Sequence, residues 1–221
     1  MIEQTELLHD MAATAQVGLR AVAVGLPTHI GHNRQGAVIS GIRKTILHGD
    51  TIAVDTLNIA GDRQADLRAH GGVDKAVYCY PAEHLPYWEQ EIGYRPDGEH
   101  APFGENLSTT GVTERDVCIG DIWRWGDVLL QISQPRWPCY KLEMHSGHAE
   151  MVKRFVASGR SGWYFRVLRA GTAPITGPIE IVERDPLAVS VHLAFAIKTS
   201  GDEAARARVL AHPSLAAAWR R

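Results

Sequence analysis

The chain has few cysteines and lacks the motifs of several common enzyme classes. Only three cysteines occur among 221 residues, at positions 79, 118 and 139, and none belongs to a CxxC pair. An odd number of widely spaced thiols argues against a disulfide framework, and free thiols fit a reducing compartment. The Walker loop, the dinucleotide-binding GxGxxG, HExxH and GxSxG are also missing. These absences argue against P-loop, Rossmann, zinc-protease and serine-hydrolase chemistry.

Long apolar runs and a strong net charge are missing as well. No stretch approaches the roughly 18 apolar residues of a membrane span. Residues 1–6 lack the basic start and apolar block of a signal peptide. The formal net charge is 23 − 25 = −2, which provides no global field for nucleic acid or membrane. We therefore expect a cytoplasmic protein that binds neither a nucleic acid polymer nor a membrane.

What the sequence does contain is a set of short β-branched runs separated by Gly, Pro, Asp and Asn. Their length suits strands, and many short strands predict a mainly β fold with few helices, as a barrel or a sandwich. A chain of this length is expected to bury about 70% of its extended surface, enough for one sizeable core. The predicted strands are 21–24, 37–39, 51–54, 116–119, 128–132 and 179–182.

Helical patterns are few. One is predicted over 81–92, starting near Leu85 because of Pro86, and another over 146–158. After residue 185 the composition changes, and Ser190, Asp202 and Ser214 are candidate N-caps of three short helices. Such short helices are marginal alone, so we expect them to pack on the β domain or on a partner chain. The predicted organisation is a leader (1–16), a β domain (17–185) and a three-helix segment (186–221).

Cys139 is the strongest candidate for chemistry. Pro135 and Pro138 restrict the backbone before it, and Arg136 and Lys141 place positive charge on either side. Positive charge favours the thiolate, which is the form that attacks electrophiles or binds metals. The alternative is a buried cysteine that acts as a small hydrophobic residue. We expect the other two cysteines, which lie in apolar strand-like runs, to be such core thiols.

Two further segments are candidates for binding an anion. Gly71 and Gly72 allow a close backbone approach to a ligand, with Arg68, His70 and Lys75 as nearby donors. The alternative for this segment is a tight turn with solvated charges. In the second segment, two cations at positions 43 and 44 lie beside a predicted strand, where an exposed basic turn is the alternative.

Asn106 lies in a Gly-Glu-Asn-Leu segment that is either a simple turn or part of a ligand site. Its amide both donates and accepts, so it is suited to bind a planar heterocycle such as a pterin. The aromatic residues at 163–165 are predicted to be core or the wall of a pocket, and Arg166 is either exposed or reaches an anion. The 11 histidines are scattered, so a metal bound through one cysteine needs a cofactor with its own donors, such as a dithiolene.

The order of these motifs resembles the MOSC domain, in particular its YiiM type, over residues 20–185. The tail resembles the small 3-alpha segment of the same subgroup, so only residues 1–16 fall outside the resemblance. The motifs that carry it are Ile-Arg-Lys at 42–44, Gly-Asp-x-Gln-Ala-Asp at 61–66, His-Gly-Gly-x-Asp-Lys-Ala-Val at 70–77, Phe-Gly-Glu-Asn-Leu at 103–107, Gln-Pro-Arg-x-Pro-Cys-x-Lys-Leu at 134–142 and Gly-Arg-Ser-Gly-Trp-Tyr at 159–164.

The resemblance implies a pyruvate-kinase-insert-like β-barrel that binds a molybdopterin-type molybdenum cofactor, with Cys139 as the molybdenum ligand or as the carrier of persulfide sulfur. It also implies a reductase of N-hydroxylated bases and related compounds, supplied with electrons by a separate flavin or iron-sulfur reductase. A sulfur or cofactor carrier without redox turnover and a cofactor-storing module remain alternatives, and the oligomeric state stays open between monomer and homodimer. The expected catalytic residues are Cys139, Asn106 and His70. The expected cofactor-binding residues are Arg43, Lys44, Arg68, His70, Gly71, Gly72, Lys75, Asn106 and Arg136.

Overall fold

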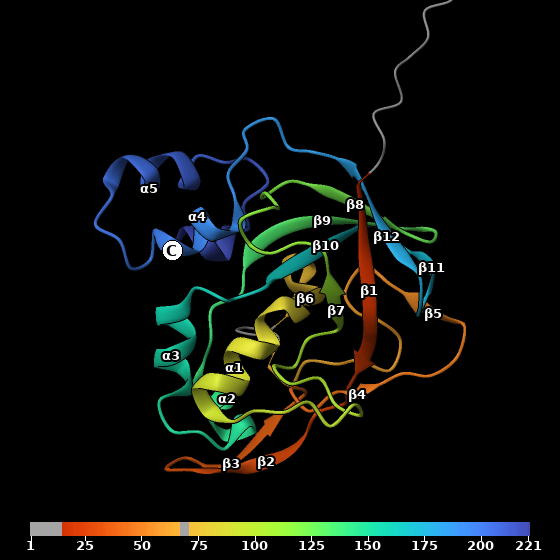
Figure 1. Ribbon diagram of the computed structural model, residues 1–221, viewed down its shortest axis with the longest axis vertical. Coiled ribbons are helices and arrows are strands. Elements are labelled where there is room, and N and C mark those ends of the chain that lie inside the picture. Colours follow the sequence, from red (N-terminus) through yellow and green to blue (C-terminus); the bar gives the residue numbers. More distant parts are fainter. Residues whose placement is uncertain (1–14, 67–70) are drawn as a thin grey trace, which may run out of the picture.

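A closed β-barrel lies at the centre of the computed structural model, which describes residues 15–66 and 71–221 (Figure 1). Seven strands pair in the order β12-β8-β9-β10-β6-β7-β1, and β1 pairs again with β12 and closes the ring. The predicted mainly β barrel with short helices is therefore confirmed. The barrel strands are β1 (Ala15–Val24), β6 (Val77–Pro81), β7 (Leu107–Thr110), β8 (Ile122–Trp125), β9 (Val128–Pro135), β10 (Trp163–Arg169) and β12 (Pro178–Glu183).

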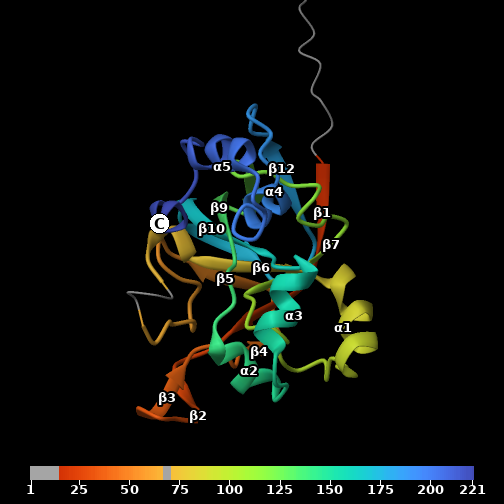
Figure 2. The same ribbon diagram turned by 90° about the vertical axis from the view of Figure 1, so that its left-hand side faces the viewer.

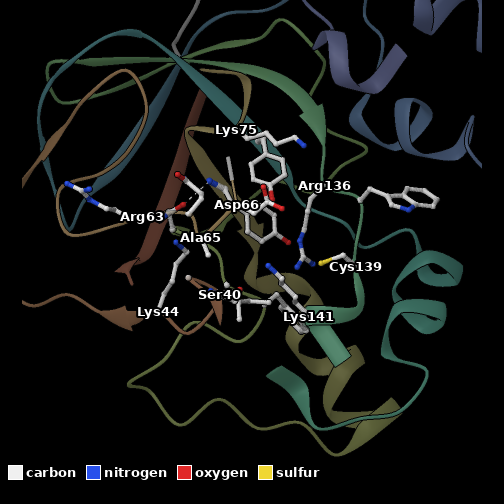
Figure 3. Close-up of a pocket in the computed structure, with 18 residues that line it drawn as sticks. Ser40, Lys44, Arg63, Ala65, Asp66, Lys75, Arg136, Cys139 and Lys141 are labelled. Atoms are coloured by element: carbon white, nitrogen blue, oxygen red, sulfur yellow. Dashed lines mark hydrogen bonds between the residues drawn. The ribbon is translucent and has the colours of Figure 1, made fainter. Parts of the chain in front are cut away.

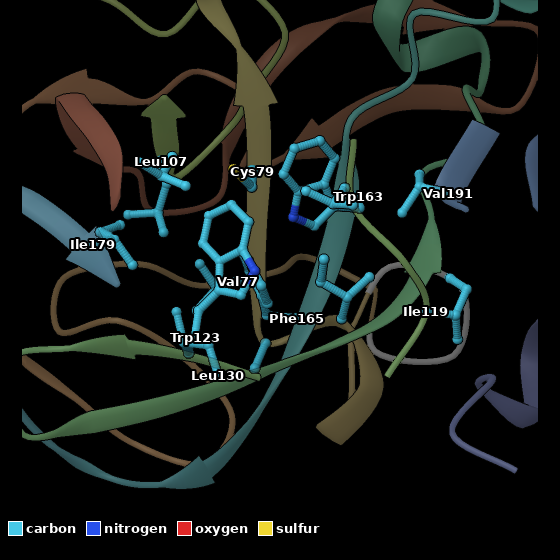
Figure 4. Close-up of a cluster of buried hydrophobic side chains, with 14 of the residues drawn as sticks. Val77, Cys79, Leu107, Ile119, Trp123, Leu130, Trp163, Phe165, Ile179 and Val191 are labelled. Carbon is cyan, nitrogen blue, oxygen red and sulfur yellow. The ribbon is translucent and has the colours of Figure 1, made fainter. Parts of the chain in front are cut away.

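Large apolar side chains fill the inside of the barrel (Figure 4). Trp123, Trp163 and Phe165 are all fully buried there. The rings of Trp123 and Phe165 meet edge to face, with centroids 5.1 Å apart, a favourable arrangement for aromatic pairs. Because side chains occupy the interior of this small barrel, a ligand site has to lie outside it.

Shorter elements surround the barrel. A hairpin formed by β2 and β3 projects from one end together with α2 (Figure 2). The remaining strands are β2 (Thr28–Asn33), β3 (Gly36–Ser40), β4 (Thr45–Ile46), β5 (Thr51–Val54) and β11 (Gly171–Pro174). The helices are α1 (Leu85–Ile92), α2 (Tyr140–Ser146), α3 (Met151–Ser158), α4 (Val191–Ala196) and α5 (Glu203–Leu210), with 3-10 turns η1 (Val73–Lys75), η2 (Ala82–His84) and η3 (Ala217–Arg220).

Strands β6 and β7 run parallel, so residues 82–106 must cross over between them and include α1 on the way. A second apolar cluster holds this crossover in place. Its buried members include Tyr80 of β6, Trp88 of α1, Phe103 and Phe155 of α3. The rings of Trp88 and Phe155 are stacked with centroids 5.7 Å apart. This packing fixes the position of residues 103–106, which form one wall of the site described below.

The structure confirms one of the predicted helices and corrects two other elements. Helix α1 begins at Leu85 as predicted. The helix predicted from residue 146 begins only at Met151, because Gly147, with φ 70°, ends a separate helix, α2. The predicted strand 116–119 forms only an isolated bridge through Cys118, whose backbone N–H donates to the Asp121 carboxylate at 3.0 Å. A side chain thus takes the donor that a strand would have paired.

The C-terminal segment packs on the barrel. Ser190 and Asp202 cap α4 and α5 as predicted, whereas the third helical element is the 3-10 turn η3, without a side-chain cap. Phe195 and Trp219 join the same apolar cluster as the barrel interior. The division at residue 185 stays a prediction. Residues 15 and 16 of the predicted leader belong to β1, and the rest of it lies outside the described residues. In the described chain, no helix has the length and apolarity to cross a membrane.

Candidate functional site

A pocket of about 690 Å³, counted with the space open to solvent at its mouth, lies beside the barrel where the end of β9 meets three loops (Figure 3). Those loops supply residues 40–42 and 44, residues 63–66, and residues 103, 104 and 106 to its walls. Cationic side chains from separate segments line the pocket. Among the described lining residues, Cys139 provides the thiol. The lining cations are Lys44, Arg63, Lys75, Arg136 and Lys141.

Cys139 is placed in the pocket by the turn from β9 into α2. It is the N-cap residue of α2, and its extended backbone, with φ −131° and ψ 170°, follows the buried Pro138. The Leu142 backbone N–H donates to the Cys139 carbonyl at 2.9 Å, which ties the loop to the first turn of the helix. The thiol is half-buried, in contrast to the fully buried Cys79 of β6. Burial also raises the pKa values of Cys79 and of the half-buried Cys118.

The guanidinium of Arg136 lies next to the Cys139 sulfur (Figure 3). Arg136 is only 6% exposed, and its charged group lies 5.0 Å from the ring centroids of both Tyr78 and Phe155. Burial acts to lower the pKa of Arg136, but its interactions with the neighbouring Tyr78, Tyr164 and Cys139 outweigh burial and raise the pKa. Its buried Nη1 has no hydrogen-bond partner among the described residues. This leaves one buried, charged donor available at the pocket.

Lys44 forms a buried ion pair with Asp62 below the pocket. The same Asp62 oxygen accepts the backbone N–H of Gly25 at 2.9 Å, whereas the second carboxylate oxygen is buried without a partner in the described chain. Burial lowers the pKa of Lys44, an effect that Asp62 and Glu105 partly offset. The Lys44 ammonium group therefore has a fixed position in the pocket wall, and the Asp62 carboxylate compensates its charge.

Two phenols and one more lysine also line the pocket. Burial raises the pKa values of Tyr78 and Tyr164, so both phenols stay neutral and act as hydrogen-bonding groups. The rings of these tyrosines lie 5.2 Å apart and form an aromatic wall. Lys75 lies half-buried at the end of η1, and burial lowers its pKa.

Asn106 lines the pocket, but its amide already bridges two strands. Its Oδ1 accepts the Tyr78 backbone N–H at 3.0 Å, and its Nδ2 donates to the Ala23 carbonyl at 3.1 Å. Its own backbone N–H and carbonyl bond to the same two residues, at 2.7 and 2.8 Å. The described contacts therefore give Asn106 a structural role, and its part in binding a ligand stays a prediction.

The structure brings together about half of the predicted site. Cys139, Lys44, Lys75, Asn106 and Arg136 line the pocket. Arg43 is exposed, donates to the His29 carbonyl at 3.3 Å and is not among the lining residues, nor are Gly71 and Gly72. Arg68 and His70 lie outside the described residues.

Arg63 and Tyr78 also line the pocket, although the sequence analysis names neither of them as a site residue. Tyr164 fits the expectation that residues 163–165 include a pocket wall, and Arg166 instead pairs with Asp74 at 2.7 Å. No group of three or more His, Cys, Asp or Glu side chains suited to a metal ion occurs within residues 15–66 and 71–221.

Comparisons with known proteins identify the family. The model of the MOSC domain matches residues 66–183. Protein YiiM of Escherichia coli (strain K12) is 38% identical over 190 residues, 82% of each chain. The uncharacterized protein YflK of Bacillus subtilis (strain 168) is 44% identical over 165 residues, 74% of each chain. A protein named Reductase from Gibberella moniliformis is 36% identical over 180 residues, which are 79% of this chain and 31% of that protein.

The fold agrees with a solved structure of the same group. The crystal structure of YiiM from Geobacillus stearothermophilus matches with a TM-score of 0.75 and 35% identity, covering 92% of this chain and 95% of that one. The region that the family model matches contains the pocket residues Lys75, Asn106, Arg136 and Cys139. The chain is a YiiM-like member of the MOSC domain family.

Proposed function

We propose that the chain is a molybdenum-cofactor-dependent oxidoreductase that reduces N-hydroxylated bases or related N-oxygenated compounds. The observation that carries this proposal is the juxtaposition of Cys139 with the buried guanidinium of Arg136 in a pocket lined by further cations. One sulfur ligand and several phosphate-binding groups are what a phosphorylated dithiolene cofactor requires from a protein. The reductase-named relative supports the reductive direction.

The donor set of the pocket fits such a cofactor. The partnerless Nη1 of Arg136 is a buried donor, and an anion placed against it would satisfy it. The cofactor, when bound, would supply a redox-active metal and its own sulfur donors.

The side chains of the chain then have distinct tasks. Cys139 would hold the metal through its sulfur, and the buried guanidinium of Arg136 would place a positive charge beside that sulfur. Lys75 and the Lys44 head group bind phosphate oxygens through charge-assisted hydrogen bonds. Tyr164 keeps its proton, so its hydroxyl would donate a hydrogen bond to a polar ligand atom, whereas the Tyr78 hydroxyl already donates to the Ser161 carbonyl at 2.9 Å. The overall reaction consumes two electrons and two protons, converts N–OH to N–H and releases water.

The first test is metal content. The chain is expressed in a host that makes the cofactor, and bound molybdenum and pterin are measured for wild type, Cys139→Ser and Cys118→Ser. We expect stoichiometric molybdenum in wild type and in Cys118→Ser, because that thiol lies outside the pocket lining. Cys139→Ser is expected to lose it. Full molybdenum in Cys139→Ser would reject the ligand role.

The second test is turnover, because metal binding alone also fits a carrier or a storage module. Loaded wild-type protein with an artificial electron donor is expected to reduce an N-hydroxylated purine or an amidoxime. No turnover with molybdenum fully bound would reject the reductase. Native mass spectrometry separates the carrier, which would show a persulfide adduct of about 32 Da on Cys139 without molybdenum. The physiological electrons are expected from a separate flavin or iron-sulfur reductase.

A further inference from the structure

Trp137 combines exposure with a fixed position at the site. It lines the pocket two residues before Cys139, yet 41% of its surface remains exposed. Its backbone is restricted because Pro138 follows it, and Pro138 is itself buried. Part of a positionally restricted indole is therefore accessible at the pocket.

The C-terminal segment supports the other side of this ring. The Phe195 ring of α4 lies with its centroid 5.1 Å from that of Trp137, at an interplanar angle of 32°. The ring of Trp219 meets Trp137 edge to face at 6.2 Å. Both supporting rings are almost fully buried, and the Trp219 indole N–H is fixed by a 3.0 Å hydrogen bond to the Ala194 carbonyl. The segment therefore holds Trp137 as a rigid plate.

We propose that Trp137 is the platform on which the ring of a planar, base-like substrate stacks, next to Cys139, and that Phe195 and Trp219 set its orientation. The proposal rests on the proposed function for the identity of the substrate class. A held indole face is suited to this because every planar base presents a π face, and stacking tolerates differences among bases. A tryptophan with two rotatable bonds, already fixed by its neighbours, loses little entropy on binding.

The proposal places Trp137 at the substrate and not at the cofactor. The polar and cationic groups that suit the cofactor come from the walls around Arg136, Lys44 and Lys75. Trp137 instead joins the pocket to the C-terminal segment, whose apolar side chains face it. It therefore determines specificity through ring contact and takes no part in proton or electron transfer.

The test separates ring recognition from chemistry. Binding of adenine, which carries no N–OH group, to molybdenum-loaded protein is measured by calorimetry for wild type, Trp137→Phe and Trp137→Ala. Adenine affinity is expected to fall roughly 10-fold in Trp137→Ala and no more than about 3-fold in Trp137→Phe, which keeps an aromatic face. In Trp137→Ala the KM for an N-hydroxylated purine is expected to rise by a factor similar to the loss of adenine affinity, with kcat nearly unchanged. The kinetics with hydroxylamine, which has no ring, are expected to stay as in wild type.

Tyr140→Ala is the matched control, because Tyr140 is also an exposed aromatic beside Cys139, 47% exposed, but is not among the lining residues. It is expected to bind adenine as wild type does. Unchanged adenine affinity in Trp137→Ala, absence of adenine binding in wild type, or loss of pterin from Trp137→Ala would each overturn the platform. Adenine binding that depends on Trp137 in a protein without reductase turnover would retain the platform and reject the proposed function.

Discussion

Lys44 and Asp62 pair their charges almost out of reach of solvent, with side chains 7% and 0% exposed. The pair joins the strand-like segment before β4 to the loop that follows β5, two of the segments that form the pocket. A buried ion pair is weak evidence for net stability, but removal of one partner leaves an uncompensated charge. The walls of the site and the stability of the fold therefore depend on the same contact.

The first prediction follows from that dependence. Lys44→Met is expected to lower the free energy of unfolding of the cofactor-free protein by about 3–5 kcal/mol, because Asp62 is left buried and unpaired. Lys44→Met/Asp62→Asn removes the orphaned charge and is expected to recover part of the loss. Urea denaturation of wild type, Lys44→Met, Asp62→Asn and the double variant forms a double-mutant cycle, which measures the interaction free energy between Lys44 and Asp62. Additive losses would contradict it.

The second prediction concerns Asn106. Its side chain bonds to Tyr78 of β6 and Ala23 of β1, so Asn106→Ala leaves a buried donor and a buried acceptor unpaired. We expect a loss of about 2–4 kcal/mol in the free energy of unfolding. Asn106→Asp retains the acceptor for Tyr78 and is expected to lose less if its carboxyl is protonated, at low pH. Chemical denaturation at two pH values checks this, and a cost below about 0.5 kcal/mol for Asn106→Ala would refute the structural role.

The third prediction is a pH dependence of stability from Glu105. Burial raises the pKa of this carboxyl from 4.5 to about 7, although two backbone N–H groups, Arg136 and Lys44 act to lower it. Between these values the folded protein holds a proton that the unfolded chain has released, so stability falls as the pH rises from about 4.5 to 7 and levels off above. The shift corresponds to about 3–4 kcal/mol.

Glu105→Gln provides the comparison for that slope. Because it cannot ionise, the variant is expected to lose this part of the pH dependence while the Phe103 backbone N–H still has an amide oxygen to bond. Thermal or urea denaturation between pH 4.5 and 8 gives both curves. Identical slopes for the two proteins would rule out Glu105 as the source.

The fourth prediction uses thiol accessibility. Cys79 is fully buried and its pKa is raised, so native protein without cofactor is expected to leave it unmodified by iodoacetamide. Cys139 lines an open pocket and is expected to be alkylated under the same conditions. Peptide mass spectrometry before and after denaturation measures both, and native labelling of Cys79 at the rate of Cys139 would contradict the placement.

The sequence predicted those features that depend on local physics. Ser190 and Asp202 are caps because their side chains satisfy nearby backbone N–H groups, and such signals need only a few neighbouring residues. Cys139 was identified in the same way, from its prolines and flanking cations. The strand expected at 116–119 does not form, because the Asp121 carboxylate accepts the Cys118 backbone N–H that a strand would have paired.

Other site residues depend on long-range pairing. In the sequence, Tyr78 has the pattern of an ordinary strand residue. It reaches the pocket only because β6 pairs with β10, which places Tyr78 opposite Tyr164. The role of Asn106 as a bridge likewise follows from barrel closure, which no local pattern encodes. Arg43 and Lys44 are neighbours in the sequence, but Lys44 is buried at the pocket, whereas Arg43 is exposed and is not among the lining residues, a difference that no local pattern shows.

The parallel pairing of β6 and β7 has a consequence for redesign of this protein. A hairpin cannot join parallel strands, so the crossover of residues 82–106 is obligatory, yet only its last residues contact the pocket. The stretch around Asp97 and Gly98 is exposed and lies between the packed helix α1 and that wall. A peptide tag or spacer inserted there would lengthen an exposed loop and leave the pocket intact. We therefore expect this stretch to be a suitable insertion site for a reporter.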